Sequence, residues 1–276
     1  MSFKDAKKKA KMNTIMARKK IIDRFNRRFG NKPSISSMLP NITTLMGICS
    51  GMSSIHFALL EKWDFCIIAI ILAALFDAMD GSIARLLKSS SQMGMELDSL
   101  ADLISFGAAP AVVMYLYSLN IFGKYGWSIS LFYTCCMALR LARFNTLALS
   151  EEEKPAWQEG FFVGIPAPAA AFLCMLPLSM DMQFGGSNLE NNYPIPTGIW
   201  MIIIGFFMVS KIPTFSMKKI RVSKRLILPI MILFTLLITL AVSAPWLAYI
   251  AIALIFISSI PISYIVFKRR SSKHIN

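Results

Sequence analysis

The sequence contains few groups that bind soft metals or form disulfides. It has two histidines and five cysteines among 276 residues. All five cysteines lie in apolar stretches, none belongs to a CxxC pair, and no histidine lies near them at ligand spacing. Cysteines in such positions usually serve as small apolar residues of the interior. The sequence therefore supports neither a zinc site nor a disulfide framework.

Acidic residues are also scarce, with 15 Asp and Glu against 29 Lys and Arg, and the formal net charge is +14. Such an excess could serve nucleic-acid binding. However, 55% of the residues are hydrophobic and they occur in long blocks, which is incompatible with a nucleic-acid-binding fold. In a protein with several membrane spans, basic residues gather on the cytoplasmic side and contact anionic lipid. We therefore expect a membrane protein that binds lipid and no nucleic acid.

Eight apolar blocks each come close to the roughly 20 residues that cross a bilayer as a helix. They are residues 41–60, 65–86, 95–119, 127–149, 160–180, 197–215, 226–243 and 246–267. Eight spans put both termini on one side, and the loops then outside contain only Lys62 and Lys124 of the 29 basic residues. By the positive-inside rule, both termini are cytoplasmic. The predicted fold is an all-α polytopic helical bundle of about eight spans in the cytoplasmic (inner) cell membrane.

The N-terminal segment is strongly basic, with 12 Lys or Arg and two Asp in residues 1–35. Its hydrophobic residues fall partly on one helical face, so residues 13–30 are predicted to lie on the membrane surface. A disordered basic tail is the alternative. No short apolar core with a cleavage site follows, unlike a secretory signal. We divide the chain into this segment (1–38), a core of six spans (39–218), and two further spans with a basic tail (219–276).

Four aspartates stand at the junction of the second and third spans. Asp77 and Asp80 end one apolar block, and Asp98 and Asp102 open the next. Helical spacing puts each pair on one face. A carboxylate at membrane depth is costly unless it is paired, bound to metal or open to water. Oxygen ligands without His or Cys favour Mg²⁺ or Mn²⁺. Interhelical polar pairs and a cation pathway are the alternatives. In the predicted topology the site lies at the cytoplasmic interface.

The aspartates belong to a longer pattern: Asp-x-x-Asp-Gly-x-x-Ala-Arg at 77–85, eight residues, then Gly-x-x-x-Asp-x-x-x-Asp at 94–102. This pattern resembles, at every position, the signature of the CDP-alcohol phosphotransferases. The resemblance implies that an alcohol attacks the β-phosphate of a CDP-linked substrate and that CMP leaves. It also implies a homodimer.

The resemblance assigns roles residue by residue. The metal ligands, for two Mg²⁺ or Mn²⁺ ions, would be Asp77, Asp80, Asp98 and Asp102. Asp102 would also be the catalytic base for the incoming hydroxyl. The CDP-diacylglycerol site would comprise Gly81, Ala84, Arg85 and Gly94, together with Asn41 and Thr44 at the start of the first span.

Further blocks resemble the phosphatidylserine synthase branch of this family. They are DSLADLISFGAAP (98–110), ALRLARFN (138–145), GIPAPAAA (164–171) and MVSKIPTFSMK (208–218). The branch's substrates are CDP-diacylglycerol and L-serine. The carboxylate of serine needs a cation, so we assign Arg140 and Arg143, with Asn145, to serine binding. The alternative for these arginines is positive-inside topology or contact with lipid phosphate.

Alternative functions stay open at this point. The same chemistry could act on choline, glycerol 3-phosphate or an inositol phosphate. A protein of another class, a cation transporter, could use the intramembrane aspartates as its pathway. Two structural features are also expected. Gly47 and Gly51 should allow close helix packing, with a dimer seam as the alternative. Pro166 and Pro168 should kink the fifth span, or could equally be ordinary prolines of a membrane helix.

Overall fold

The computed structural model describes residues 35–87, 92–149, 161–185, 193–215 and 224–275. The predicted membrane-surface segment at residues 13–30 lies outside these ranges. Nearly all of the described residues are helical, and the one sheet among them has two short strands. The all-α class predicted from the sequence is therefore confirmed, with this small sheet as an addition.

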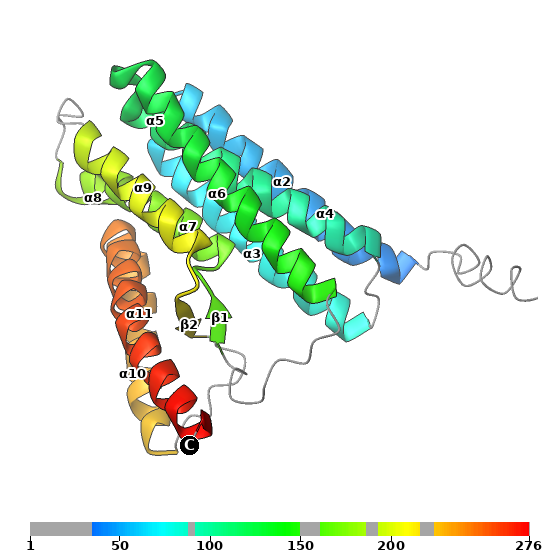
Figure 1. Ribbon diagram of the computed structural model, residues 1–276. Helices are drawn as coiled ribbons and strands as arrows, with labels where there is room; N and C mark the ends of the chain where they lie inside the picture. Colours follow the sequence, from blue (N-terminus) through cyan, green and yellow to red (C-terminus); the bar gives the residue numbers. More distant parts are fainter. Residues whose placement is uncertain (1–34, 88–91, 150–160, 186–192, 216–223, 276) are drawn as a thin grey trace, which may run out of the picture.

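Long helices run side by side through the first half of the structure (Figure 1). In chain order they are α2 (Ile35–Leu59), α3 (Trp63–Leu87), α4 (Gln92–Asp102), the π-helix η1 (Leu103–Ala108), α5 (Ala109–Tyr117), the 3₁₀ helix η2 (Leu119–Phe122) and α6 (Lys124–Leu149). A tight turn joins α2 to α3, in which the backbone N–H of Lys62 donates to the carbonyl of Phe57 at 3.0 Å.

This path brings four helix ends together. The start of α2, the end of α3, the start of α4 and the end of α6 meet at what we call the aspartate end of the bundle (Figure 1). The end of α2, the start of α3, the end of α5 and the start of α6 form the opposite, or far, end. Residues distant in the sequence therefore share one end of the bundle.

The second half of the described chain packs against these helices. It consists of β1 (Phe161–Val163), α7 (Ala167–Cys174), α8 (Leu176–Phe184), α9 (Pro194–Val209), β2 (Pro213–Phe215), α10 (Lys224–Ser243) and α11 (Pro245–Ile275). The two strands are antiparallel, with Phe161 opposite Phe215. α9 packs against α6, and α11 packs against α8 and β2. α10 packs against α11, and Figure 1 shows these two helices as a pair beside the bundle.

Four helices in the described ranges are long and apolar enough to span a membrane: Met38–Leu59, Trp63–Leu87, Met93–Tyr117 and Pro245–Lys268. They coincide with the first, second, third and eighth predicted spans. Two shorter apolar helices, Pro194–Val209 and Leu228–Ser243, coincide with the sixth and seventh. The structure thus supports a helical membrane protein, and the count of eight spans stays a prediction.

The fifth predicted span is not a single helix. Its described residues, 161–180, include β1, α7 and the first part of α8, and the helices are interrupted at Met175. Pro166 caps α7 and Pro168 lies in its first turn, where a proline needs no N–H. The prediction that these two prolines kink the span is therefore wrong. The break falls instead before Pro177, whose missing N–H cannot bond the carbonyl of Leu173.

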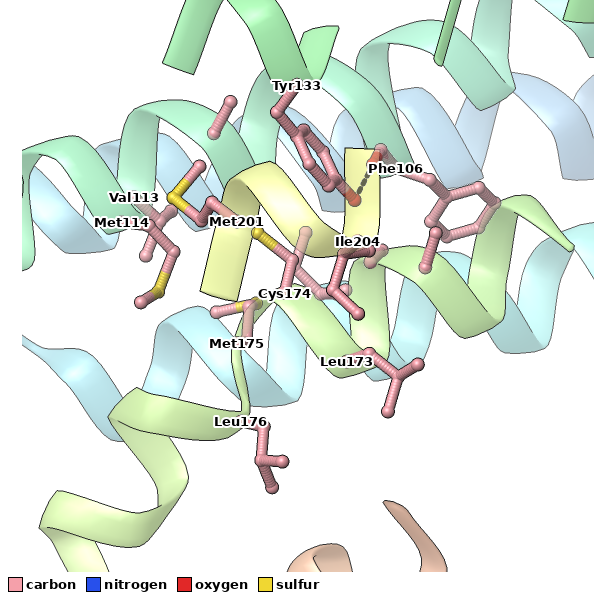
Figure 2. Close-up of a cluster of buried hydrophobic side chains, with 14 of the residues drawn as sticks. Phe106, Val113, Met114, Tyr133, Leu173, Cys174, Met175, Leu176, Met201 and Ile204 are labelled. Atoms are coloured by element: carbon pink, nitrogen blue, oxygen red, sulfur yellow. Dashed lines mark hydrogen bonds between the residues drawn. The ribbon is translucent and has the colours of Figure 1, made fainter. Parts of the chain in front are cut away.

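The third span has a local change of helix type just after the aspartates. In η1 the backbone N–H of Ala109 donates to the carbonyl of Ile104, five residues earlier. Pro110 offers no N–H to the carbonyl of Phe106, and the hydroxyl of Tyr133 on α6 donates to that carbonyl at 3.2 Å. Figure 2 shows this bond within the buried apolar cluster. A neighbouring helix thus supplies the donor that the chain itself lacks.

The predicted close packing of the first span is confirmed at Gly51. A Cβ there would lie 2.7 Å from the Cα of Ser105 in η1, a separation that real Cβ atoms do not tolerate. In addition, the Ser105 hydroxyl donates to the carbonyl of Gly47 at 3.1 Å. α2 and η1 therefore approach each other closely, directly beside the aspartates.

Candidate metal centre

The four aspartates line one small cleft of about 10 Å³ at the aspartate end. α3 contributes Asp77 and Asp80, and α4 contributes Asp98 and Asp102. The other lining residues are Thr44, Gly47, Ala73, Ala101, Ser105 and Phe106. The sequence predicted that each pair shares a helix face, and the structure turns both faces toward each other. The cleft has space for about one water-sized group.

Three of the aspartates converge. Asp77, Asp98 and Asp102 each offer a carboxylate oxygen, and these oxygens lie within 4.8 Å of one another. A divalent ion with metal–oxygen distances of about 2.1–2.6 Å holds oxygens up to about 4–5 Å apart. Carboxylates are the hard ligands that Mg²⁺, Mn²⁺ and Ca²⁺ prefer. The donor set therefore fits a divalent cation.

Asp80 has different surroundings. It is buried, and its Oδ2 accepts a hydrogen bond of 2.7 Å from the hydroxyl of Thr44 on α2. The same hydroxyl lies 2.8 Å from the carbonyl oxygen of Pro40. The two acceptors share the one hydroxyl hydrogen, and the bond to Asp80 links this carboxylate to α2. This contact joins a residue predicted to approach the nucleotide to one predicted to bind metal.

Three small residues that line the cleft were not assigned to it in the sequence analysis. Gly47 lies three residues after Thr44, Ala73 four before Asp77, and Ser105 three after Asp102. Residues at these spacings lie on the same helix face. Helical spacing from the aspartate motif could therefore have identified them as the walls of the site.

The remaining motif residues lie around the cleft rather than in it. Gly81 is exposed, and a Cβ at this position would meet no protein atom within 4 Å. Packing against the described protein therefore does not require a glycine there, whereas close approach of a ligand to the backbone would. Arg85 is exposed and its guanidinium lies 3.3 Å from the hydroxyl of Ser82. Ala84, Gly94 and Asn41 are half-buried.

A second, larger pocket of about 50 Å³ adjoins the arginines of α6. Its lining includes Arg140 and Arg143, Val163 of β1, and Val209 of α9. Arg140 donates from Nε to the carbonyl of Ile165 at 2.7 Å, and Arg143 from Nη1 to the carbonyl of Val209 at 3.2 Å. Both guanidinium groups are thereby oriented by backbone carbonyls of the second half of the chain.

Arg140 also links this pocket to the aspartates, because it interacts electrostatically with Asp102 and Asp77. Asn145, the third predicted serine contact, makes reciprocal hydrogen bonds with Ser99, at 2.9 and 3.2 Å. Ser99 directly follows Asp98. The structure thus links two of the predicted serine-binding residues to the acidic cleft: Arg140 through its charge, and Asn145 through Ser99 on the helix that carries Asp98 and Asp102. Asn145 is not among the described residues that line the arginine pocket.

Comparisons with known proteins agree with this geometry. Residues 37–257 match the family described as CDP-alcohol phosphatidyltransferase. The chain is 37% identical over 224 residues to the CDP-diacylglycerol–serine O-phosphatidyltransferase of Mycobacterium leprae, covering 81% of this chain and 73% of that protein. It is 33% identical over 199 residues to the protein of the same name from Helicobacter pylori, covering 72% and 81%.

A relative from Bacillus subtilis with the same name is 32% identical over 181 residues, 66% of this chain and 92% of that protein. The matched family region contains the acidic cleft, the arginine pocket and most of the helices that position them. The chain therefore belongs to the CDP-alcohol phosphatidyltransferase family.

Proposed function

We propose that the protein transfers the phosphatidyl group of CDP-diacylglycerol to the hydroxyl of L-serine, giving phosphatidylserine and CMP. The observation that carries this proposal is the convergence of three carboxylates, with a fourth beside them, at helix ends inside the matched family region. The names of the relatives favour serine as the acceptor.

Asp77, Asp80, Asp98 and Asp102 would hold two ions, Mg²⁺ or Mn²⁺. Bound there, the ions would neutralise the charge of the pyrophosphate and of the transition state. Asp102 would accept the proton of the incoming hydroxyl as the oxygen bonds to the β-phosphorus and the bond to CMP breaks. Its electrostatic interaction with Arg140, which lines the arginine pocket, supports this role.

The CDP-diacylglycerol site would comprise Asn41, Thr44, Gly81, Ala84, Arg85 and Gly94. The open space at Gly81 supports this assignment, since a pyrophosphate can approach the helix backbone there. Arg85 is exposed beside it and can add a planar cationic contact to phosphate.

Serine would bind at the arginine pocket. Arg140 and Arg143 can hold its carboxylate. Hydrogen bonds to backbone carbonyls already restrain both side chains, so each arginine loses less conformational entropy when serine binds. Asn145 shares one amide hydrogen and its oxygen with Ser99, so its second amide hydrogen can serve the ligand. Arg140 interacts electrostatically with Asp102, which suits an acceptor whose hydroxyl must reach that carboxylate.

We further propose that the protein lies in the inner cell membrane as a homodimer, with both termini and the active site on the cytoplasmic side. The arginines Arg85, Arg140 and Arg143 all lie at the aspartate end, whereas Lys62 and Lys124 lie at the far end. This distribution agrees with the positive-inside prediction.

The test uses the purified full chain with CDP-diacylglycerol and labelled serine, choline, glycerol 3-phosphate or inositol phosphate. We expect labelled lipid and CMP with serine alone, loss of both with EDTA, and recovery with Mg²⁺ or Mn²⁺. Asp98→Asn should lower CMP release more than about 100-fold, because an essential carboxylate ligand is lost. Arg143→Ala should raise the KM for serine about tenfold by removing a charged hydrogen bond.

Asp64→Asn is the matched control, because Asp64 is an exposed aspartate at the far end of the same helix as Asp77. It should retain full activity. Normal turnover by Asp98→Asn would refute the metal assignment. Labelled lipid formed from another alcohol, and none from serine, would identify that alcohol as the acceptor. Cation uptake into vesicles without any nucleotide would favour the transporter instead.

A further inference from the structure

A cavity of about 420 Å³ lies remote from the acidic cleft, between the end of α5, α8 and the start of α9. We call it the far-end cavity. Its described lining includes Tyr117, Leu176, Asp181, Phe184, Tyr193 and Trp200. Tyr117 follows Asp102 by 15 residues in a continuous helical run, which separates the two sites by about 20 Å along the helix axis.

The chemistry of the far-end cavity combines an apolar surface with one negative charge. Among the described residues that line it, Asp181 is the one charged side chain. Its Oδ2 accepts a hydrogen bond of 2.7 Å from the hydroxyl of Tyr117, whose ring in turn packs edge-on against Trp63 at 5.3 Å. The neutral hydroxyl of Tyr117 thus holds the carboxylate of Asp181 in place without neutralising its negative charge.

The walls are aromatic and partly open to the surroundings. Trp200 is fixed by a hydrogen bond of 2.7 Å from its Nε1 to the carbonyl of Leu173. Phe184 and Tyr193 are 68% and 64% exposed, so the cavity can be reached from outside the bundle. Aromatic rings attract organic cations to their faces, and they are enriched where a membrane meets water.

The predicted outer loop beside the cavity is acidic. Residues 181–196 contain two acidic residues, Asp181 among them, and no Lys or Arg. The far end also has Lys62 and Lys124, but neither belongs to the described lining of the cavity. In the predicted topology this end of the bundle meets the outer leaflet. A ligand that complements it therefore needs a cation for Asp181 and an alkyl chain for the apolar walls. A head group that also bears a carboxylate would be repelled.

From these features we propose that the far-end cavity binds a phospholipid of the outer leaflet whose head group carries an ammonium and no carboxylate. The ammonium pairs with the carboxylate of Asp181, and part of an acyl chain occupies the apolar space beside Trp200 and Leu176. This site is separate from the substrate site and does not depend on which alcohol the enzyme uses.

The test titrates the purified full chain with phosphatidylethanolamine and with its N-acetylated derivative, which keeps the acyl chains and loses the cation. Bound lipid is counted by native mass spectrometry. The wild type should bind the ammonium lipid at least about tenfold more tightly, as expected for a charge-assisted hydrogen bond. Equal binding of the two lipids by the wild type would overturn the proposal.

Two variants locate the effect. Asp181→Asn keeps an acceptor for the Tyr117 hydroxyl but loses the charge. The two lipids should then bind to this variant with about equal affinity. Tyr117→Phe removes the neutral donor and keeps the charge, so the preference should persist. An unchanged preference in Asp181→Asn would place the ammonium elsewhere and reject the site. CMP release by both variants should match the wild type, which shows that they are folded and that the two sites are independent.

Discussion

The carboxylates of the acidic cleft differ in their surroundings, and the difference assigns them different tasks. Asp77, Asp98 and Asp102 have carboxylate oxygens within 4.8 Å of one another, so the ionised groups repel unless a cation lies among them or a proton is taken up. Asp80 is buried and accepts from the hydroxyl of Thr44. A carboxylate that must keep one orientation benefits from such a bond, since a buried acceptor without a donor is costly. We infer that Thr44 positions Asp80.

This gives a prediction at the scale of a single hydroxyl. Thr44→Val keeps the shape of the side chain and removes the donor to Asp80. The metal concentration for half-maximal CMP release should rise about tenfold or more, as is typical when a partner of a metal ligand is lost. Thr44→Ser should restore most of the affinity, because it restores the hydroxyl. The measurement is a metal titration at saturating CDP-diacylglycerol.

Thr43→Val is the control, because the hydroxyl of Thr43 bonds to carbonyls of its own helix, those of Leu39 and Pro40. It should leave the metal titration unchanged. If Thr44→Val instead raises the KM for CDP-diacylglycerol with the metal titration unaltered, Thr44 contacts the nucleotide and does not position Asp80.

The sequence could predict the acidic residues of the site because their spacing follows the helix repeat and a family pattern. It could not predict the Thr44–Asp80 contact or the Ser99–Asn145 pair. These bonds join residues 36 and 46 positions apart, and they depend on which faces of neighbouring helices meet. Periodicity within one helix carries no information about the rotation of the next.

At the scale of the helices, prolines and aromatic donors are matched across the bundle. Pro110 and Pro177 each remove the N–H that would bond a carbonyl four residues earlier. The carbonyl of Phe106 is bonded by Tyr133, and that of Leu173 by Trp200. In an apolar interior an unpaired carbonyl is costly. These cross-helix bonds therefore allow the π-helix beside Asp102 and the break between α7 and α8.

This arrangement predicts a coupling between Tyr133 and Pro110. Tyr133→Phe should lower the free energy of unfolding by about 1–3 kcal/mol, because the carbonyl of Phe106 is left without its donor in a buried place. In the background of Pro110→Ala the loss should be smaller, since residue 110 then has an N–H for that carbonyl. Thermal unfolding of the four proteins in one detergent measures the coupling.

Tyr264→Phe serves as the control, because Tyr264 is 51% exposed on α11 and the same atom is removed. It should change the melting temperature little. Equal losses from Tyr133→Phe in both backgrounds would show that the two residues are independent, and that the π-helix has another cause.

For the molecule as a whole, hydropathy predicted where helices lie better than where they stop. The sixth predicted span, residues 197–215, includes β2, and the helix itself, α9, has 16 residues. At about 1.5 Å per residue it is about 24 Å long, shorter than a hydrocarbon core of about 30 Å. An apolar strand adds to a hydropathy window as much as a helix does, so composition alone cannot separate them.

The two ends of the bundle lead to a last prediction about the whole chain. Arginines of α3 and α6 gather with the aspartates, where a soluble nucleotide must leave, so this end should face the cytoplasm. Lys124 and Lys211 are both exposed, at the far end and near the aspartate end respectively. In an active background with all native cysteines replaced by alanine, Lys124→Cys should react with a membrane-impermeant maleimide in intact cells. Lys211→Cys should react only after the membrane is opened. The reverse pattern would show that the topology is inverted and that the far-end cavity lies in the inner leaflet.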